Sequence, residues 1–278
     1  MNLLTRALVC AATVAVCTGA TTPQNPDRTV VSFSDPSRPG TLVVHIVMGG
    51  IVVKGADVKE VTIDWHGRQN FHGPVMHDPE EESRGMHRLN QQPSITVEER
   101  NNRMTIDSPA FSIPADLEIQ VPRRTNLELS TVNAGNITVE SVDGELEVGN
   151  VNGSITLNGV GGSVVAHTVN GRVLATLMKI TPQKAMAFSS LNGAVDVSLP
   201  ASSKANLKLR SDNGSIFTDF DVHLTPPNSS FPVAEDTRGE GGRYRIDVNK
   251  AIYGSVNGGG PEIEARTFNG NIYVRKGS

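Results

Sequence analysis

The chain has 278 residues and a net charge of -4, with 25 Lys and Arg against 29 Asp and Glu. This balance excludes the extended basic surface that sequence-independent nucleic-acid binding requires, and no local cluster of Lys and Arg supplies one. The chain is rich in glycine (27) and proline (16) and has one Trp and three Tyr. This composition favours many short strands and tight turns over helices.

The N-terminus has the pattern of a secretory signal peptide. Arg6 precedes an apolar run over residues 7–16, and small residues follow up to Ala20. The run is about half of the roughly 20 residues that a membrane-spanning helix needs, so we predict a signal peptide over residues 1–20, with cleavage after Ala20 and no membrane span in the mature chain. The protein is therefore expected to be exported to the periplasm, the cell surface or the medium.

The two cysteines, Cys10 and Cys17, both lie in this signal segment. Acylation of Cys17, as in a lipoprotein, is the alternative to simple cleavage, but Val16 is larger than the residue that usually precedes such a cysteine. In either case the mature chain has no disulfide and no cysteine-based metal or catalytic site.

The remaining chain is predicted to form one elongated domain over residues 41–278. Residues 21–40 are rich in Pro, Ser, Thr and Asp and are expected to be a flexible leader. Alternating apolar and polar residues begin at Leu42. The alternation stops over residues 66–93 and again over residues 219–242, so we predict loop insertions there.

An internal repeat of nine residues dominates the middle of the chain. Glycine recurs at Gly135, Gly144, Gly153, Gly162 and Gly171. The second, fourth and seventh positions after each of these glycines are apolar, and all are expected to face inward. These positions are Ile137, Val139, Val142, Leu146, Val148, Val151, Ile155, Leu157, Val160, Val164, Ala166, Val169, Val173, Ala175 and Met178.

In seven repeat units Asn or Asp directly precedes the glycine of the repeat, and such pairs readily adopt positive φ, so each is expected to mark a corner. A meander of hairpins would place the residue before Asn and the residue after Gly on one face, yet the former is apolar and the latter mostly polar. The pattern therefore favours a solenoid with parallel stacked strands, capped by the early strands and the terminal FNGNIYVRKGS. The predicted corner pairs are Asp143 and Gly144, Asn152 and Gly153, Asn170 and Gly171, Asn192 and Gly193, Asn213 and Gly214, Asn257 and Gly258, and Asn269 and Gly270.

The signal peptide, the GGIVVKGADVKEVTID opening, the DLEIQVP strand and the serial units VNGSITL, VNGRVLA, LNGAVDV and DNGSIFT resemble the bacterial putative-adhesin family, whose domain has no assigned function. The resemblance covers residues 42–274. It implies an all-β fold, a single-stranded right-handed β-helix or β-solenoid, located outside the cytoplasm, and it brings no catalytic motif.

Metal binding has two candidate sources in the sequence. Nine-residue Gly/Asp repeats bind calcium in secreted toxins, but the corners here carry mostly neutral Asn, so no serial calcium site is expected. The insertion over residues 66–93 contains His66, His72, His77 and His87, which are suitable zinc donors in residue type but not in spacing. We expect no cofactor, and these histidines are the only weak metal-ligand candidates.

Two functions remain open. The preferred one is a non-enzymatic, exported adhesin-like or envelope scaffold protein that binds a surface protein or a glycan. The alternative is a β-helix enzyme that acts on envelope polysaccharide, which would need clustered carboxylates. Glu140, Glu145 and Glu147 are the only acidic cluster in the regular repeat, and no G-x-S-x-G, H-E-x-x-H or phosphate-loop motif occurs.

Overall fold

The computed structural model describes residues 27–67, 95–108, 114–133, 135–225, 234–236, 244–246 and 251–277, and all regular structure there is β-strand, which confirms the all-β class. The strands are β1 (Arg28–Ser32), β2 (Gly40–Met48), β3 (Ile51–Ala56), β4 (Glu60–Gly67), β5 (Thr96–Arg100), β6 (Arg103–Asp107), β7 (Ala115–Pro122), β8 (Thr125–Asn133), β9 (Ile137–Glu140), β10 (Asp143–Asn152), β11 (Ile155–Asn170), β12 (Val173–Leu177), β13 (Met186–Asn192), β14 (Val195–Pro200), β15 (Ala205–Asn213), β16 (Ile216–Thr218), β17 (Val222–Thr225), β18 (Ala234–Asp236), β19 (Tyr244–Ile246), β20 (Ile252–Val256), β21 (Glu262–Asn269) and β22 (Ile272–Gly277).

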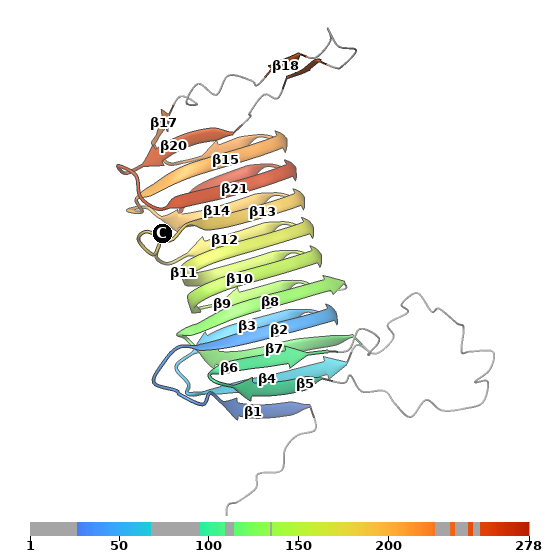
Figure 1. The fold of residues 1–278 in the computed structure, drawn as a ribbon. Coiled ribbons are helices and arrows are strands. Elements are labelled where there is room, and N and C mark those ends of the chain that lie inside the picture. The colour runs from blue at the N-terminus through green and yellow to red at the C-terminus, as the bar shows by residue number, and fades with distance from the viewer. Residues whose placement is uncertain are drawn as a thin grey trace, which may run out of the picture.

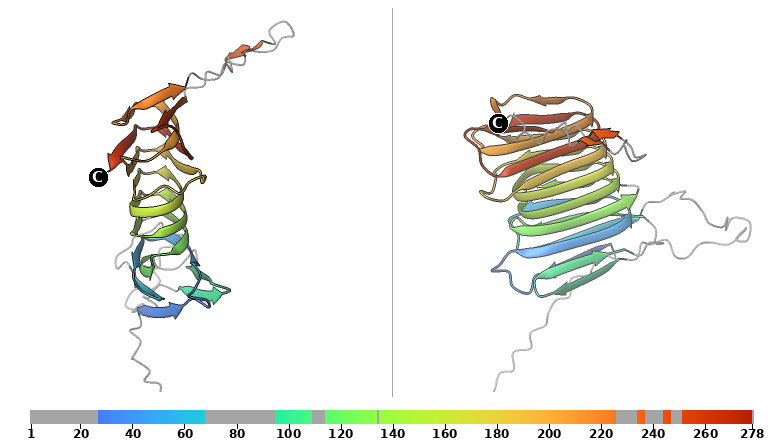
Figure 2. Two further views of the ribbon diagram at one scale, coloured as in Figure 1. Left: turned by 90° about the vertical axis from the view of Figure 1, so that its left-hand side faces the viewer. Right: turned by 45° about the horizontal axis from the view of Figure 1, so that its top comes forward.

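The strands stack in two facing rows, and from β6 to β16 the chain passes alternately from one row to the other (Figure 1, Figure 2). Sheet B runs in the spatial order β5, β6, β2, β8, β10, β11, β13, β21, β15, β20 and β17. Sheet A runs in the order β1, β4, β7, β3, β9, β11, β12, β14, β22 and β16. Strand β11 bends from sheet A into sheet B and belongs to both.

The nine-residue repeat is half of one coil, where a coil is one strand of sheet B followed by one strand of sheet A. Ile155 pairs in parallel register with Ile137 on one side and Val173 on the other, and Leu146 pairs with Val164. Equivalent residues of successive coils are thus 18 positions apart, as in the hydrogen bond between Asn170 and Asn152. The parallel pairing agrees with the stacking expected from the sequence and excludes a meander of hairpins in this region.

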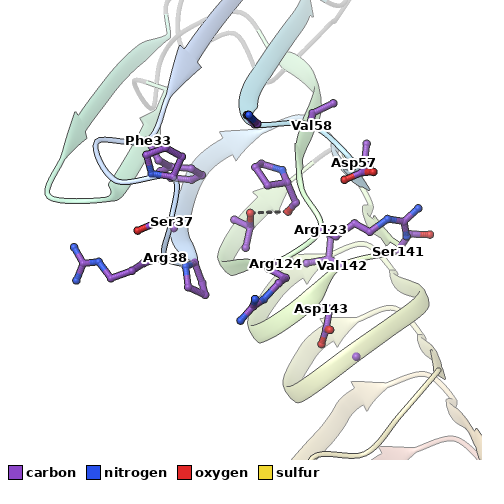
Figure 3. Close-up of a pocket in the computed structure, with 18 of the residues that line it drawn as sticks. Phe33, Ser37, Arg38, Asp57, Val58, Arg123, Arg124, Ser141, Val142 and Asp143 are labelled. Carbon is purple, nitrogen blue, oxygen red and sulfur yellow. Dashed lines mark hydrogen bonds between the residues drawn. The ribbon is translucent and has the colours of Figure 1, made fainter.

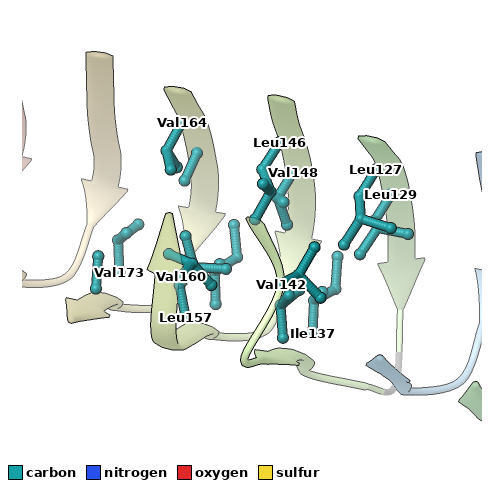
Figure 4. Close-up of a cluster of buried hydrophobic side chains, with 14 of the residues drawn as sticks. Leu127, Leu129, Ile137, Val142, Leu146, Val148, Leu157, Val160, Val164 and Val173 are labelled. Atoms are coloured by element: carbon teal, nitrogen blue, oxygen red, sulfur yellow. The ribbon is translucent and has the colours of Figure 1, made fainter. Parts of the chain in front are cut away.

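Aliphatic side chains fill the space between the two sheets (Figure 4). The second and fourth positions of all five repeats are buried, at 3% exposure or less. Because side chains alternate along a strand, both positions face the same side, and the two sheets bury them against each other. Phe188 on β13 is the largest fully buried side chain. The core is continuous along the stack, and most of the buried polar side chains of the described residues lie at one edge of it.

The seventh position of the repeat behaves differently on the two sheets, which corrects the expectation that all fifteen apolar positions face inward. Val142 and Val160, which follow sheet A strands, are buried, whereas on sheet B Val151 is 37% exposed and Val169 is half-buried. Met178 also follows a sheet A strand but is 69% exposed, and Leu177, the register partner of Val160, is buried instead. Along sheet B the alternation continues unbroken, so the residue before Asn points outward. It forms an exposed apolar row of Val132, Val151, Val169, Leu191 and Phe268.

Stacked asparagines form a hydrogen-bonded ladder where the chain leaves sheet B, here called the ladder edge. Each side-chain amide donates from Nδ2 to Oδ1 of the asparagine in the next coil, over 2.7–3.0 Å. Such a ladder satisfies the polar side chains at every corner and fixes the register of the coils. Its members, in spatial order, are Asn133, Asn152, Asn170, Asn192, Asn269 and Asn213.

A second row of polar side chains lies inside the ladder edge, two residues before each asparagine. Thr168 Oγ1 donates to the carbonyl of Gly153 in the adjacent coil at 2.8 Å, and the equivalent Thr, Ser or Asn of the other coils donates in the same way to the corner glycine of the coil beside it. These side chains replace the hydrogen bonds to water that the corner carbonyls lose when they are buried. They are Thr131, Asn150, Thr168, Ser190, Thr267 and Ser211.

We expect Asn150→Thr to raise the free energy of unfolding by about 1 kcal/mol, because Asn150 Oδ1 is buried and has no hydrogen-bond partner among the described atoms. Threonine would keep the bond to the Gly135 carbonyl, which Asn150 Nδ2 makes at 3.0 Å. Thr168→Val, which leaves the Gly153 carbonyl unpaired, should lower stability by a similar amount. Urea unfolding measures both, and an Asn150→Thr variant no more stable than the parent would contradict this interpretation.

The order of coils along the stack departs from the order in the sequence at both ends. Strands β2 and β3 lie between β6–β7 and β8–β9. The terminal strands β21 and β22 lie between β13–β14 and β15–β16. The terminal FNGNIYVRKGS is therefore an inner coil and not a cap. Antiparallel strands close the ends instead: β5, β4 and β1 at one end, and β20 and β17 at the other.

The segment expected to be a flexible leader contributes structure from Arg28 onward. Strand β1 pairs antiparallel with β4, and the loop over residues 33–39 carries Phe33, which is 5% exposed, into the core. Most of the two predicted insertions lies outside the described residues. Among the described residues in and beside these insertions, β4 extends to Gly67 and β17 pairs with β20. Strands β18 and β19 form a separate antiparallel pair.

Candidate functional site

The edge opposite the ladder, where the chain passes from sheet A back to sheet B, is built differently and is here called the groove edge. The chain turns there through Ser141 at φ 57° and Gly159 at φ 60°, which occupy equivalent positions in successive coils. A register shift follows between Asn158 and Val160. The shift reverses the side-chain alternation, so Val142 and Val160 turn into the core and the backbone leaves a hollow outside them.

Two adjoining pockets form a groove along this edge. The first, of about 510 Å³, is bounded by loops of several coils (Figure 3). The second, of about 570 Å³, continues from it and shares Met178 and Lys179. Both volumes lie within the range of about 300–1,000 Å³ that is typical of ligand pockets. The groove is lined by residues 36–40, 56–59, 122–125, 141–143, 178–180 and 259–261, among others.

One wall of the first pocket is the loop over residues 33–39, which Asn102 and Glu99 hold in place. Asn102 Oδ1 accepts a hydrogen bond from the backbone N–H of Asp35 at 2.7 Å. Glu99 accepts from the Ser34 hydroxyl at 2.6 and 2.7 Å, and from the backbone N–H groups of Ser34 and Asn102. The Ser34 hydroxyl is the main reason that the pKa of Glu99 lies below its usual value.

The loop should loosen in acid because its anchor must be ionised. A carboxyl with a lowered folded-state pKa contributes stability that is complete above its unfolded pKa, here 4.5, and that is lost as the pH falls through the folded value. We therefore expect the amide of Ser34 to lose hydrogen-exchange protection, relative to the core, as the pH falls below 4.5. In Glu99→Gln the protection should be low already at neutral pH. Glu98→Gln, a change at an exposed neighbour, should behave as the parent does.

The first pocket is lined by more cations than carboxylates. Lys179 Nζ lies 2.6 Å from Asp143 Oδ2, and Arg38 Nε lies 2.7 Å from Asp35 Oδ2. The side chains of Lys59, Arg123 and Arg124 are exposed and make no ion pair with any described residue. Uncompensated cations at a concave surface favour an anionic ligand.

Backbone hydrogen bonds hold the turn that carries Arg123 and Arg124. The N–H of Arg123 donates to the carbonyl of Ala56 at 3.0 Å, and its carbonyl accepts from the N–H of Asp143 at 2.7 Å. Figure 3 shows Arg123 and Arg124 extending in different directions from this one turn, Arg123 toward the side of Asp57 and Arg124 toward the side of Arg38. The turn thus presents two guanidinium groups along the groove.

The predicted metal-ligand candidates do not meet in the described structure. His66 is exposed near the end of β4, and His72, His77 and His87 lie outside the described residues. In the part of the chain that the structure describes, no group of three His, Cys, Asp or Glu side chains could hold a metal ion. The acidic cluster of the repeat is also divided, because Glu140 lies on sheet A and Glu145 and Glu147 lie on sheet B.

The predicted corner pairs fall into three groups. The pairs that begin at Asn152, Asn170, Asn192, Asn213 and Asn269 form the ladder edge with Asn133. Asp143 and Gly144 stand at the groove edge, in register with Gly161 and Gly162. Asn257 and Gly258 form a turn after β20 at φ 52° and 89°, and Asn257 donates to the carbonyls of Ala201 and Ser203 instead of joining the ladder.

A close Ser–His contact, not expected from the sequence, lies on the outer face of sheet B. His45 Nδ1 on β2 is 2.6 Å from Ser130 Oγ on β8. The two residues are 85 positions apart and meet because parallel register places them side by side. No sequence signal connects them, since their pairing depends on the insertion of β2 between β6 and β8. They stand on an open sheet surface and not among the residues that line the groove.

Comparison with known proteins finds a distant likeness among solved structures. No protein-family model and no curated protein matches the chain. A crystal structure of a putative cell adhesion protein from Clostridium sporogenes aligns with 12% sequence identity and a TM-score of 0.43, over 91% of this chain and 100% of that chain. This likeness is too distant to transfer a function. In the described residues no helix is long and apolar enough to cross a membrane.

Proposed function

We propose that this protein is an exported, non-enzymatic, adhesin-like binding protein, a right-handed β-solenoid whose groove edge binds a glycan or protein of the cell envelope. The observation that carries the proposal is the groove itself. It continues from one pocket to the next along one edge of the stack, and its walls come from residues as far apart in sequence as Phe33 and Pro261.

The construction of the stack supports a binding role. The coils are held by parallel backbone pairing, by a continuous aliphatic core and by the ladder edge. A surface fixed in this way loses little conformational entropy when a ligand binds, which favours affinity. The groove lining contains no histidine, and one of its two carboxylates in the first pocket, Asp143, is paired with Lys179. That lining suits recognition better than acid–base catalysis.

Cell-envelope binding by the processed, exported chain tests the proposal. We expect the fluorescently labelled protein to sediment with isolated envelopes and to bind a subset of a glycan array, without releasing reducing sugars from either. Localisation of the tagged full chain tests export separately, and the predicted signal peptide over residues 1–20 requires that the mature form lie outside the cytoplasm. Retention in the cytoplasm, or the absence of any envelope binding, would contradict the proposal.

The contact between His45 and Ser130 favours a second candidate, the solenoid enzyme acting on envelope polysaccharide. A histidine within hydrogen-bond distance of a serine hydroxyl is the arrangement that activates a nucleophile. The register partner of His45 on the other side is Asp107 on β6, but no hydrogen bond joins them. Release of reducing sugars that His45→Ala abolishes, with unchanged binding to envelopes, would establish this candidate over the first.

A further inference from the structure

The charge of the groove stands out against the rest of the chain. The first pocket is lined by Arg38, Lys59, Arg123, Arg124 and Lys179 and by only two carboxylates, those of Asp57 and Asp143. The whole chain has the opposite balance, with 29 acidic against 25 basic residues. A positive site on an acidic protein draws anions to one place and repels them elsewhere, so the binding of an anion is localised.

The free cations are arranged for an extended ligand. Beyond Met178 and Lys179 the groove continues into the second pocket, where Lys204 is a further cation. Together the two pockets are longer than a single small anion needs. A ligand with charged groups at intervals along a chain would meet Lys59, Arg123 and Arg124 in the first pocket and Lys204 in the second.

The uncharged part of the lining fits sugar rings better than nucleic-acid bases. Val58 and Met178 provide exposed apolar surface between the cations. Phe33 is the only aromatic residue in the lining of either pocket, and it is 5% exposed, so the groove offers no ring on which a base could stack. Single-stranded nucleic acid is therefore the less suitable polyanion.

We propose that the groove binds an acidic polysaccharide chain, with Arg123, Arg124 and Lys59 contacting its carboxylate or sulfate groups. The inference rests on the proposed binding function and narrows it to a ligand class. Guanidinium groups suit this role because they stay charged and can donate two hydrogen bonds to one carboxylate or sulfate. The binding constant is expected to fall as salt is added, since the contacts lie at an exposed surface.

The test compares acidic and neutral polysaccharides. The processed, exported chain is titrated calorimetrically with dextran sulfate, with neutral dextran and with polygalacturonate. We expect both acidic polymers to bind and dextran not to bind. The double variant Arg123→Gln/Arg124→Gln should bind the acidic polymers about tenfold more weakly. A matched control, Arg172→Gln/Arg266→Gln, removes the same charge at exposed positions that line neither pocket and should stay within about twofold of the parent.

Four results would overturn the inference: no binding of either acidic polymer, equal binding of dextran, an equal loss in the control variant, or tighter binding of poly(dT) than of the polysaccharides. Thermal unfolding by circular dichroism shows that both variants fold, and the changed side chains are exposed. The same samples are sedimented with cell envelopes. Envelope binding without affinity for acidic polymers overturns this inference and leaves the proposed function in place. The absence of envelope binding contradicts the proposed function.

Discussion

Gly171→Ala is expected to lower the free energy of unfolding by about 3 kcal/mol, although it adds a single methyl group. A Cβ at Gly171 would lie 2.1 Å from the carbonyl oxygen and 2.5 Å from the carbonyl carbon of Gly153 in the neighbouring coil. Both atoms belong to backbone, so relief requires the coils to move apart. That movement would lengthen the hydrogen bonds that Asn170 makes in the ladder to both of its neighbours.

The clash repeats at every ladder corner, so the requirement for glycine there is steric. A Cβ at Gly153, Gly193, Gly214 or Gly270 would approach the carbonyl oxygen of the adjacent corner to between 1.9 and 2.2 Å. Gly258 provides the control, because its φ of 89° disfavours alanine but nothing lies within 4 Å of the added Cβ. Gly258→Ala should cost about 1 kcal/mol. Equal losses in the two variants, measured by urea unfolding, would show that close packing of the coils does not set the requirement.

Phe188→Ala should destabilise the protein by about 4 kcal/mol, because it leaves a cavity in a core that cannot collapse. Phe188 is 0% exposed on β13, and the strands on either side of it, β11 and β21, are fixed by backbone hydrogen bonds. The rigid spacing of stacked parallel strands limits any relaxation into the space.

Phe268→Ala is the matched control for this substitution. It removes the same side chain from β21, the neighbouring strand, but at a position 46% exposed on the outer face. The expected loss is below about 1 kcal/mol. Urea unfolding followed by far-UV circular dichroism measures both variants. If the two losses were similar, Phe188 would not be packed between the sheets as described.

Binding of the acidic polysaccharide proposed for the groove should depend on the order of the loop over residues 33–39. That loop provides one wall of the first pocket and is held by Glu99 and Asn102. Loosening the wall in acid should therefore weaken binding in the same pH range in which Ser34 loses its exchange protection. The polysaccharide titration and the exchange measurement thus examine one structural element through two independent quantities.

Sequence reasoning predicted the parallel stacking but assigned one position of the repeat wrongly. The residues before the ladder asparagines Asn152 and Asn170 are apolar and were expected to face inward, yet Val151 is 37% exposed and Val169 is half-buried. The side chain that points inward is that of the polar residue one position earlier, such as Thr168, whose hydroxyl donates a hydrogen bond to a corner carbonyl. Hydrophobicity alone could not reveal this, because a buried hydroxyl is favourable only where a particular backbone oxygen lies within its reach.

The sequence by itself determined the class of fold, the repeat and the Asn-Gly corners of the ladder edge. The class and the repeat follow from side-chain alternation along a strand, and the glycines of the ladder corners are required because the coils pack closely there. Only the tertiary structure decided the order of the coils and the position of the groove. The corner motif of β21 is the same as that of its neighbours, so a repeat unit fits equally well at several levels of the stack. The place of β21 in the stack depends on which strand edges remain unpaired once the rest of the chain has folded. Residues such as Lys59, Arg123 and Lys179 share a groove only because of the resulting order of coils.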